Sequence, residues 1–406
     1  MANSILQGKR IILGVTGSIA CYKAVDLASK LAQVEANLDV ILTESAGRFV
    51  SPLSFQSVTG REAYSDLWRD SDHVRHVKLG ESADLLLVAP ATAHTLAKMA
   101  HGMADNLLTV TILAARCPIL VAPAMDGGMY ENPVTQANIE LLQQRGVTVI
   151  GPDTGRMASG LSGRGRMVEP TEILGYIRLI VGRNGPLMGK HLVVTAGSTQ
   201  EPLDPVRYLT NRSSGKQGLA LAQAAIDAGA TVDLISGPTA GPTPVGVNHI
   251  QVRTAVEMHD AVLAAVKEAD ILIMAAAVAD FRPASVQEHK IKKDSQGGAD
   301  LTIFLDRNPD VLMAVQNMKR PSDRPLFTVG FAAETKDIVR HGKEKMVRKG
   351  LDFIAINDVS ASDAGFGVDT NRVILLSQDG QEEYLPLQSK ADIAERIIEA
   401  VAGTFA

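Results

Sequence analysis

Polar side chains follow several apolar runs of this chain, at the points where buried strands would leave a core. The segment "PAMDGGMY" (123–130) comes directly after "CPILVA" and presents one carboxylate, Asp126. The segments "GVTGSIACYKA" (14–24) and "SSGKQG" (213–218) each open a helical run with glycines and hydroxyls. Free N–H groups at such a turn, with the helix dipole behind them, bind anions such as phosphate. The sequence therefore indicates two phosphate sites and a carboxylate beside the first.

The first of these turns has only two glycines, Gly14 and Gly17, so the dinucleotide fingerprint GxGxxG is absent. Its hydroxyl groups favour a mononucleotide phosphate, although an ordinary strand-to-helix turn is the plainer alternative. A second strand end, "VAPATAHT" (88–95), has small side chains that leave room for a planar ligand. A third segment, "GMADNLL" (102–108), offers an amide at a helix start, where it could also be a simple cap. Together the three segments predict a pocket for FMN.

The second phosphate segment ends the stretch "TAGSTQEPLDPVRYLTNRSSGKQG" (195–218). Its two serines and its lysine suit a phosphate chain, but the spacing GxxxxGK(S/T) is absent, which disfavours P-loop hydrolysis. Further along, Asp280 ends a buried run, and the lysines of "EHKIKK" (288–293) follow it. Those lysines fit either a solvated face or a flap that closes over a triphosphate.

Other reactive side chains give weaker indications. His73 and His76 precede a predicted strand, and histidine titrates near neutral pH, but surface histidines are common. Cys21 and Cys117 are too few for a disulfide framework, and no CxxC or HxxxH spacing predicts a metal cluster. The net charge of −5 gives no reason to expect nucleic-acid binding. With no signal peptide or apolar run of about 18 residues, we expect a cytoplasmic protein.

The elements that position these residues form two similar halves. In each, short β-branched runs that are apolar on both faces alternate with helical stretches, which is typical of a parallel sheet covered on both sides. The predicted fold class is α/β, with two doubly wound, Rossmann-like domains. We place them at residues 1–182 and 190–406, joined by the linker "RNGPLMG" (183–189). Ligands of such sheets bind at the carboxyl ends of the strands, where every segment described above lies.

The first half resembles the flavin-dependent cysteine decarboxylases in "GSIACYKA", "HVKLGESADLLLVAPATA", "GMADNLL", "PAMD" and "GRGRMVEP". It is most similar to the decarboxylase half of the bifunctional phosphopantothenoylcysteine decarboxylase/phosphopantothenate–cysteine ligase family, which implies a flavodoxin-like first domain. The family converts 4′-phosphopantothenoylcysteine into 4′-phosphopantetheine with FMN. Its active-site histidine falls on His76. The resemblance places the FMN contacts at Gly17, Ser18, Thr43, Ala89, Thr92, Asn106 and Met125.

Two positions depart from the family pattern. The Pro-Ala-Met triplet is usually followed by an asparagine that holds the substrate carboxylate, but here Asp126 follows it. An ionised aspartate would repel that carboxylate unless it were protonated or bound another group, such as His76 or the substrate amide. The flap segment usually contains a cysteine that acts in the reduction of the enethiol, but here Ser159 replaces it. A hydroxyl is a much poorer proton donor than a thiol with a pKa of about 8.5. We interpret the two changes as a co-adapted variant of the catalytic site.

The second half resembles the phosphopantothenate–cysteine ligase half of the same family across residues 190–377. The resemblance implies that CTP activates 4′-phosphopantothenate as an acyl-cytidylate, which the amine of cysteine then attacks. It assigns Asn211 to the acyl intermediate, Lys290 to the departing pyrophosphate, and Asp280 to the nucleotide and its magnesium. The remaining CTP contacts that it implies are Ser213, Ser214, Gly215, Lys216, Asn308, Pro309, Asp310, Phe331, Lys345 and Lys349.

Three alternatives remain beside a complete bifunctional enzyme of coenzyme A biosynthesis. Because of Asp126 and Ser159, the first domain could bind FMN and drive assembly only, or could stop at the oxidised enethiol. A dehydrogenase is a poorer alternative, because the dinucleotide glycines are missing and no ribose-binding acid ends the run "TVDLIS". The resemblance also implies trimeric contacts through the first domain and dimeric contacts through the second, which would together form a dodecamer.

Overall fold

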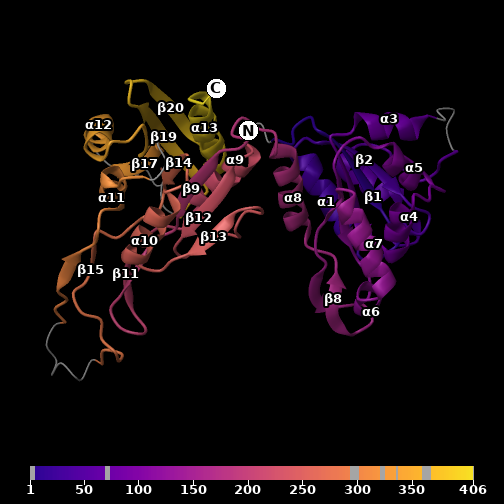
Figure 1. Ribbon diagram of the computed structural model, residues 1–406, viewed down its shortest axis with the longest axis horizontal. Coiled ribbons are helices and arrows are strands. Elements are labelled where there is room, and N and C mark those ends of the chain that lie inside the picture. The colour runs from indigo at the N-terminus through magenta and orange to yellow at the C-terminus, as the bar shows by residue number, and fades with distance from the viewer. Residues whose placement is uncertain are drawn as a thin grey trace. The chain divides into compact units, whose positions relative to one another are not determined.

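The structure is a computed structural model that describes residues 5–68, 74–292, 301–320, 325–334, 337–358 and 367–405. The chain forms two compact units, one ending at Val181 and the other starting at Gly182. Each contains one large sheet with helices on its faces (Figure 1). This arrangement confirms the predicted α/β fold class with two Rossmann-like sheets.

The first unit contains a six-stranded parallel sheet in the order β3-β2-β1-β4-β5-β6. All seven residues of β4 are buried, because helices cover both faces of the sheet and apolar clusters fill both sides. The strands are β1 (Arg10–Val15), β2 (Asn37–Leu42), β3 (Ala63–Tyr64), β4 (Leu85–Ala91), β5 (Ile119–Pro123) and β6 (Thr148–Val149). The α-helices are α1 (Cys21–Gln33), α2 (Pro52–Thr59), α3 (Arg75–Ser82), α4 (Ala93–His101), α5 (Leu107–Ala114), α6 (Gly127–Tyr130), α7 (Pro133–Gln144) and α8 (Pro170–Gly182), with a 3₁₀ turn at Ala46–Arg48.

A separate antiparallel hairpin follows β6 in the first unit. Its strands are β7 (Asp153–Arg156) and β8 (Ser162–Arg166), and residues 157–161 join them. We call this hairpin with its turn (153–166) the flap. It packs against α6 at one end of the unit, beyond the carboxyl end of β5 (Figure 1). The sequence indicated a flap segment here through its resemblance to the family, but it did not predict a two-stranded hairpin.

The second unit contains an eight-stranded sheet in the order β13-β12-β9-β14-β17-β18-β19-β20. It is parallel from β13 to β18, whereas β19 and β20 are antiparallel additions at one edge. The strands of this sheet are β9 (His191–Ala196), β12 (Thr231–Ser236), β13 (Asn248–Gln251), β14 (Ile271–Met274), β17 (Phe327–Glu334), β18 (Phe353–Asp358), β19 (Thr370–Ser377) and β20 (Glu382–Ser389). The helices are α9 (Lys216–Asp227), α10 (Ala255–Ala265), α11 (Val311–Asn317), α12 (Ile338–Lys349) and α13 (Lys390–Gly403).

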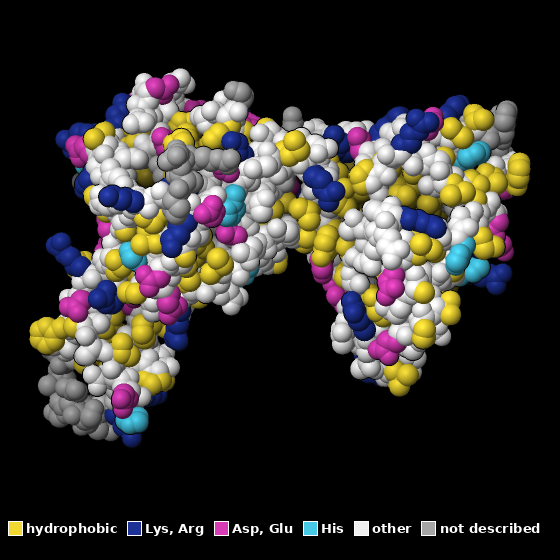
Figure 2. All heavy atoms as spheres, viewed as in Figure 1, with side chains coloured by type: hydrophobic (Ala, Val, Ile, Leu, Met, Phe, Trp, Pro, Cys, Tyr) yellow, Lys and Arg dark blue, Asp and Glu magenta, His cyan; other side chains and the backbone are white. Residues whose placement is uncertain are grey.

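Two short hairpins extend this unit beyond its sheet. They pair β10 (Gln200–Pro202) with β11 (Tyr208–Thr210), and β15 (Phe281–Pro283) with β16 (Leu305–Arg307). The β15–β16 arm carries exposed hydrophobic side chains, among them Phe304 with 78% of its surface exposed (Figure 2). These hairpins leave the sheet after β9 and β14, so they flank the edge at which ligands of such a fold bind.

Candidate active sites

The loops after β1 and β4 of the first unit are tied together. The Thr16 hydroxyl donates to the Pro90 carbonyl (2.7 Å) and accepts from the Thr92 N–H (3.0 Å). A Cβ on Gly17 would lie 2.5 Å from the Cβ of Ser45, so only glycine allows the loops after β1 and β2 to approach this closely. The turn that precedes α1 is thereby held at the carboxyl edge of the sheet, with its N–H groups beside an open cavity.

That cavity has a volume of about 1140 Å³, which is ample for a mononucleotide with a substrate beside it. It is bounded by the turn before α1, the loop after β2, the starts of α4 and α5, the β5–α6 loop and the flap. Its lining includes Gly17, Ser18, Lys23, Thr43, Thr92, His94, Lys98, Asn106, Met125, Asp126, Arg156, Ser159 and Arg166.

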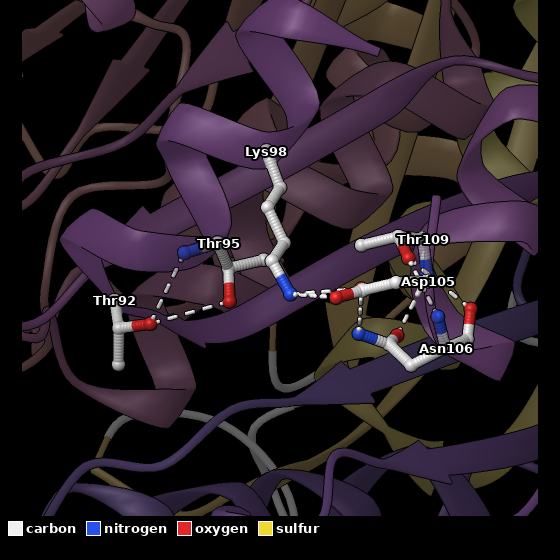
Figure 3. A network of polar contacts seen from close by, with 6 residues as sticks. All are labelled: Thr92, Thr95, Lys98, Asp105, Asn106 and Thr109. Carbon is white, nitrogen blue, oxygen red and sulfur yellow. Dashed lines mark hydrogen bonds and ion pairs between the residues drawn. The ribbon is translucent and has the colours of Figure 1, made fainter. Parts of the chain in front are cut away.

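One wall of the cavity is a hydrogen-bonded network between α4 and α5 (Figure 3). Thr92 caps α4, and Asn106 caps α5 through a reciprocal pair of bonds with Thr109. Lys98 pairs with Asp105 at 2.6 Å, and this ion pair lowers the pKa of the Asp105 carboxyl. Because each side chain is held by another, the wall presents its polar groups in fixed positions.

The flap is docked on the β5–α6 loop by contacts with main-chain N–H groups of the loop. The Met125 N–H donates to the Gly165 carbonyl at 3.0 Å, and the Gly127 N–H donates to the Met157 sulfur at 3.1 Å. A Cβ on Gly165 would lie 2.3 Å from the Met125 carbonyl oxygen. Nearby, the Arg164 guanidinium lies over the ring of Tyr130, 5.2 Å from its centre. The close approach of flap and loop therefore depends on the absence of a side chain at position 165.

Asp126 and Ser159 lie in direct contact where the flap turn meets the β5–α6 loop. The Ser159 hydroxyl donates to one carboxylate oxygen of Asp126 at 2.6 Å, and the Gly128 N–H donates to the other at 3.2 Å. Asp126 is the N-cap of the short helix α6. The Ser159 hydroxyl, with the Gly128 N–H second, lowers the pKa of the Asp126 carboxyl. Asp126 is therefore ionised at neutral pH, and neither His76 nor a proton is its partner here.

Positive charge gathers at the α1 side of the same cavity. The nearly buried Lys23 donates to the Met167 carbonyl (2.8 Å) and to Glu169 (2.9 Å), and Arg166 binds the same carboxylate oxygen at 2.8 Å. Lys23 is the main cause that lowers the pKa of Glu169. Two cations share one carboxylate, so an excess positive charge remains close to the N-terminus of α1, as an anionic ligand requires.

The second unit has a smaller cavity of about 340 Å³ at the carboxyl ends of its parallel strands. Gly215 begins α9 with a φ of +73°, and a Cβ on Gly218 would lie 2.5 Å from that of Ala196 at the end of β9. These glycines bring the start of a 12-residue helix against the strand end and expose its first N–H groups. On the opposite side, the Asn211 amide donates to the Val278 carbonyl at 3.2 Å.

Two lysines and an aspartate lie together at this second cavity. Lys216 pairs with Asp369 at 2.5 Å, which lowers the pKa of that carboxyl. Lys390 is 7% exposed and donates to the Val368 carbonyl at 2.6 Å. Burial, followed by repulsion from Lys216, lowers the pKa of the Lys390 ammonium. A ligand with negative charge would favour the charged form of a lysine in so enclosed a place.

The His, Cys, Asp and Glu side chains of the described ranges do not cluster as metal ligands do. No group of three or more His, Cys, Asp or Glu side chains within them is arranged to hold a metal ion. Among these residues, Asp280 is the carboxylate that lines the second cavity. None of the helices in these ranges is long and apolar enough to cross a membrane.

Comparison with known proteins gives two family matches, one for each unit. Residues 2–182 match the family described as Flavoprotein, and residues 187–404 match the DNA/pantothenate metabolism flavoprotein C-terminal domain. The coenzyme A biosynthesis bifunctional protein CoaBC of Bacillus subtilis is 44% identical over 403 residues and covers 98% of both chains. The chain belongs to this family.

Two further full-length relatives agree with this assignment. The CoaBC protein of Escherichia coli is 43% identical, and the alignment covers 98% of both chains. That of Mycobacterium tuberculosis is 46% identical, and the alignment covers 97% of this chain and 96% of that protein. A solved structure of a CoaBC C-terminal domain is 36% identical and covers 54% of this chain and 98% of that one, with a TM-score of 0.46.

Membership of the CoaBC family confirms the resemblance seen in the sequence. It confirms the prediction of a bifunctional enzyme of coenzyme A biosynthesis, with decarboxylase and ligase activities. The Flavoprotein match supports FMN as the cofactor of the first unit. The alternative in which the first unit only binds the flavin or stops early is not favoured by full-length similarity to bifunctional relatives.

Within this chain, the first cavity brings together most of the residues predicted for FMN. Ala89 differs, because it is buried inside β4. His76 lies on α3 and is not part of the cavity lining. The predicted residues that do line it are Gly17, Ser18, Thr43, Thr92, Asn106, Met125, Asp126 and Ser159.

The second cavity likewise gathers part of the residues predicted for the ligase site, which are those for CTP and the acyl intermediate. Those that line it are Asn211, Ser213, Ser214, Gly215, Lys216, Asp280, Phe331 and Lys345. Asn308 lies just beyond it, because its N–H donates to the Asp280 carbonyl at 2.9 Å, and Pro309 follows. Asp310 caps α11 and pairs with Lys349, and neither residue lines the cavity. Lys290 is exposed on the segment after β15.

Sequence reasoning missed other polar residues at these cavities. In the first unit these are Lys23, His94, Lys98 and Arg156, and in the second they are Asn357, Asn371 and Lys390. Lys23 could have been found from the sequence. It lies near the start of a helix, on an otherwise apolar face, and a lysine in such a place beside an anion-binding turn is unusual. Lys390 follows a strand far along the chain, and no local pattern connects it to the SSGKQG segment.

Proposed function

We propose that the second unit joins cysteine to 4′-phosphopantothenate with CTP and magnesium, and that the first unit decarboxylates the product with FMN. The observation that carries this proposal is the presence of two strand-end cavities, one in each unit, each with a helix N-terminus and excess lysine or arginine charge. The first is large enough for a flavin beside a substrate, whereas the second is suited to a nucleotide phosphate chain.

In the first cavity, the residues present fit FMN. The N–H groups and Ser18 hydroxyl at the start of α1, with the charge excess of Lys23 and Arg166, would hold its phosphate. The capped amide of Asn106 and the hydroxyl of Thr92 would hydrogen-bond its polar edge. When bound, FMN supplies two-electron oxidation of the thiol-bearing carbon, which makes loss of carbon dioxide easy, and later supplies the hydride.

The chain's own contribution to decarboxylation lies in the flap and the β5–α6 loop. With the flap docked, Met157 and Ser159 line the cavity beside Met125. The Ser159 hydroxyl proton is directed at Asp126, so the serine oxygen remains an acceptor for a thiol or amide of the substrate. His76 does not line its own chain's cavity, so we assign it to the cavity of a second copy.

In the second cavity, the start of α9 would cradle the triphosphate. Asp369 accepts a charge-assisted bond from Lys216, as a phosphate oxygen would. A bound nucleotide would take the place of Asp369 as the partner of Lys216. Lys345 would reach the nucleotide from α12, and Lys390 would add charge from the cavity floor. Asn211 would position the acyl group, Asp280 would bind the magnesium of the nucleotide, and Lys290 would approach the leaving pyrophosphate as the segment after β15 closes.

The remaining predictions complete the proposal. Each half would act as a domain, residues 1–182 and 190–406, with residues 183–189 as the linker. Trimeric contacts through the first domain and dimeric contacts through the second would form a cytoplasmic dodecamer. A preference for CTP over ATP would arise from contacts with the base, for which Phe331 is the candidate residue.

A coupled assay tests the proposed function. Purified protein would be incubated with 4′-phosphopantothenate, cysteine, magnesium and either CTP or ATP, and the products would be identified by mass spectrometry. We expect 4′-phosphopantetheine with CTP, CMP and pyrophosphate as the nucleotide products, and much less product with ATP. Accumulation of unchanged 4′-phosphopantothenoylcysteine would contradict the decarboxylase half, and absence of CMP would contradict the ligase half.

A further inference from the structure

The substrate of the proposed decarboxylase carries a carboxylate, and the cavity must bind it before it leaves as carbon dioxide. This inference therefore rests on the proposed function of the first unit. An arginine or lysine is the usual group for such a carboxylate, because it makes charge-assisted hydrogen bonds. Four such residues, Lys23, Lys98, Arg156 and Arg166, line the cavity.

Three of these four are held by the protein itself. Lys98 is bound through both carboxylate oxygens of Asp105, at 2.8 and 2.6 Å. Lys23 and Arg166 bind Glu169, and Lys23 is almost enclosed, with 5% of its side chain exposed. Their shared excess charge lies beside the N-terminus of α1, which suits the flavin phosphate.

Asp126 cannot replace these cations as the carboxylate anchor. It is held as an anion by the Ser159 hydroxyl at 2.6 Å, and it accepts a second bond from the Gly128 N–H. A substrate carboxylate would be repelled by it. The β5–α6 loop therefore supplies no cation and leaves the substrate carboxylate to be bound from another wall.

Arg156 is the remaining cation of the cavity. It ends β7, three residues before Ser159, and its backbone pairs with Ser162 in the flap. Over the part of the chain that the structure describes, its guanidinium has no hydrogen-bonding or ionic partner. The next residue, Met157, is fixed to the Gly127 N–H, so the arginine stem starts from an anchored point.

We propose that Arg156 binds the carboxylate of the substrate and is a specificity-determining residue of the decarboxylase. The flap then has two separate functions. Ser159 fixes the flap turn to Asp126, while Arg156 presents a planar guanidinium that matches a carboxylate through two parallel hydrogen bonds. Because the product lacks this carboxylate, loss of carbon dioxide removes the anchor and favours product release.

The test compares two unreactive ligands that differ only in this carboxylate. In 4′-phosphopantothenoylserine a hydroxyl replaces the thiol and the carboxylate remains, whereas 4′-phosphopantothenoyl-ethanolamine lacks the carboxylate. Their dissociation constants would be measured by calorimetry with the FMN-loaded full chain. We expect R156Q to weaken binding of the serine ligand about tenfold or more, the loss typical of a charge-assisted hydrogen bond, and to leave the ethanolamine ligand unchanged. We expect R156K to recover part of the loss.

The control is R164Q, which removes a charge from the same flap. Arg164 lies over Tyr130 and outside the cavity lining, so the ratio of the two dissociation constants should stay at the wild-type value. The inference would be overturned if R156Q weakened the binding of both ligands equally. It would also be overturned if R164Q changed the ratio of the two dissociation constants as much as R156Q does. FMN absorbance and ligase activity of each variant show that both units are folded. If neither ligand binds the wild-type chain, the proposed function fails and the inference falls with it; if both bind and R156Q leaves their ratio unchanged, the inference alone fails.

Discussion

The Ser159 hydroxyl donates a 2.6 Å hydrogen bond to the Asp126 carboxylate, and this contact joins the two positions at which the sequence departs from the pattern of its family. Each change alone is unfavourable, because Asp126 adds a charge that repels the substrate and Ser159 removes a thiol. Together they form a charge-assisted bond between the flap turn and the β5–α6 loop. The pairing supports the interpretation of a co-adapted site.

Removal of either member of this pair should have nearly the same effect as removal of both. S159A and D126A each lose the bond, so each should lower decarboxylase kcat/KM several-fold, and the double variant should be little worse than the worse single one. The assay would use 4′-phosphopantothenoylcysteine supplied directly. Ligase activity should remain at the wild-type level in all three. Strictly multiplicative losses would show that the residues act independently.

The flap bond should also depend on pH in a direction fixed by Asp126. Its folded-state pKa is lowered, chiefly by the Ser159 hydroxyl, so the bond is complete above the ordinary aspartate pKa of about 4 and is lost as the pH falls through the lowered value. The methyl NMR signal of Met157, labelled with ¹³C, should stay constant from pH 7 to about 4 and shift below that. In D126N the same titration should be flat. A shift centred near neutral pH would contradict this account.

Close approach of the flap should tolerate no side chain at position 165. In G165A the new Cβ would meet the Met125 carbonyl oxygen at 2.3 Å, so the flap must move and decarboxylase activity should fall at least tenfold. G163A is the matched control, because its Cβ would have only an ordinary 3.5 Å contact with the Met157 methyl group. Steady-state assays of both variants make the comparison. Equal activity of the two would show that flap docking is unimportant for turnover.

Lys390 should contribute to nucleotide binding by the ligase. K390M removes an almost buried charge at the second cavity, and the KM for CTP should rise about tenfold. Burial lowers the pKa of Lys390, so this lysine should lose its charge at a lower pH than an ordinary lysine. The wild-type KM for CTP should therefore rise with pH over that range, and this rise should be absent in K390M. K343M provides the control, since Lys343 is exposed and pairs with Glu382. An unchanged KM for CTP in K390M would contradict the role.

His76 should act across copies of the chain, because it does not line the cavity of its own unit. H76Q and G165A should each be poor decarboxylases when purified alone. When the two are co-expressed, some cavities would combine an intact flap with an intact His76, and activity should recover to a fraction of wild type. Failure of every mixed preparation to exceed the separate variants would contradict the assignment of His76 to the cavity of a second copy.

The strand-end segments were predictable because local patterns define them. Apolar runs on both faces predict buried parallel strands, and the carboxyl ends of those strands meet at one edge. Thr92, Asn106 and Ser213 were therefore found from sequence as cavity residues. The edge strand β20 and the hairpin form of the flap were less predictable, because short antiparallel pairs carry weaker patterns.

Contacts between distant positions could not be read from local patterns. The Asp126–Ser159 bond joins residues 33 positions apart, and it depends on the close approach of the flap to Met125 at Gly165. Lys216 and Asp369 are 153 positions apart, and the Lys390 carbonyl accepts from a Gln217 amide 173 positions away. Periodicity identifies elements but not the pairing of loops from separate elements, so the partner of Asp126 became evident only from the structure.

The most direct test of the central claim is the mass of the product that the wild-type chain makes from 4′-phosphopantothenoylcysteine. The account predicts 4′-phosphopantetheine, because the site built around Asp126 and Ser159 completes the reaction. A product lighter by two hydrogens would show that chemistry stops at the enethiol, and unchanged substrate would show that this pair does not support decarboxylation. Either of those results would contradict the account.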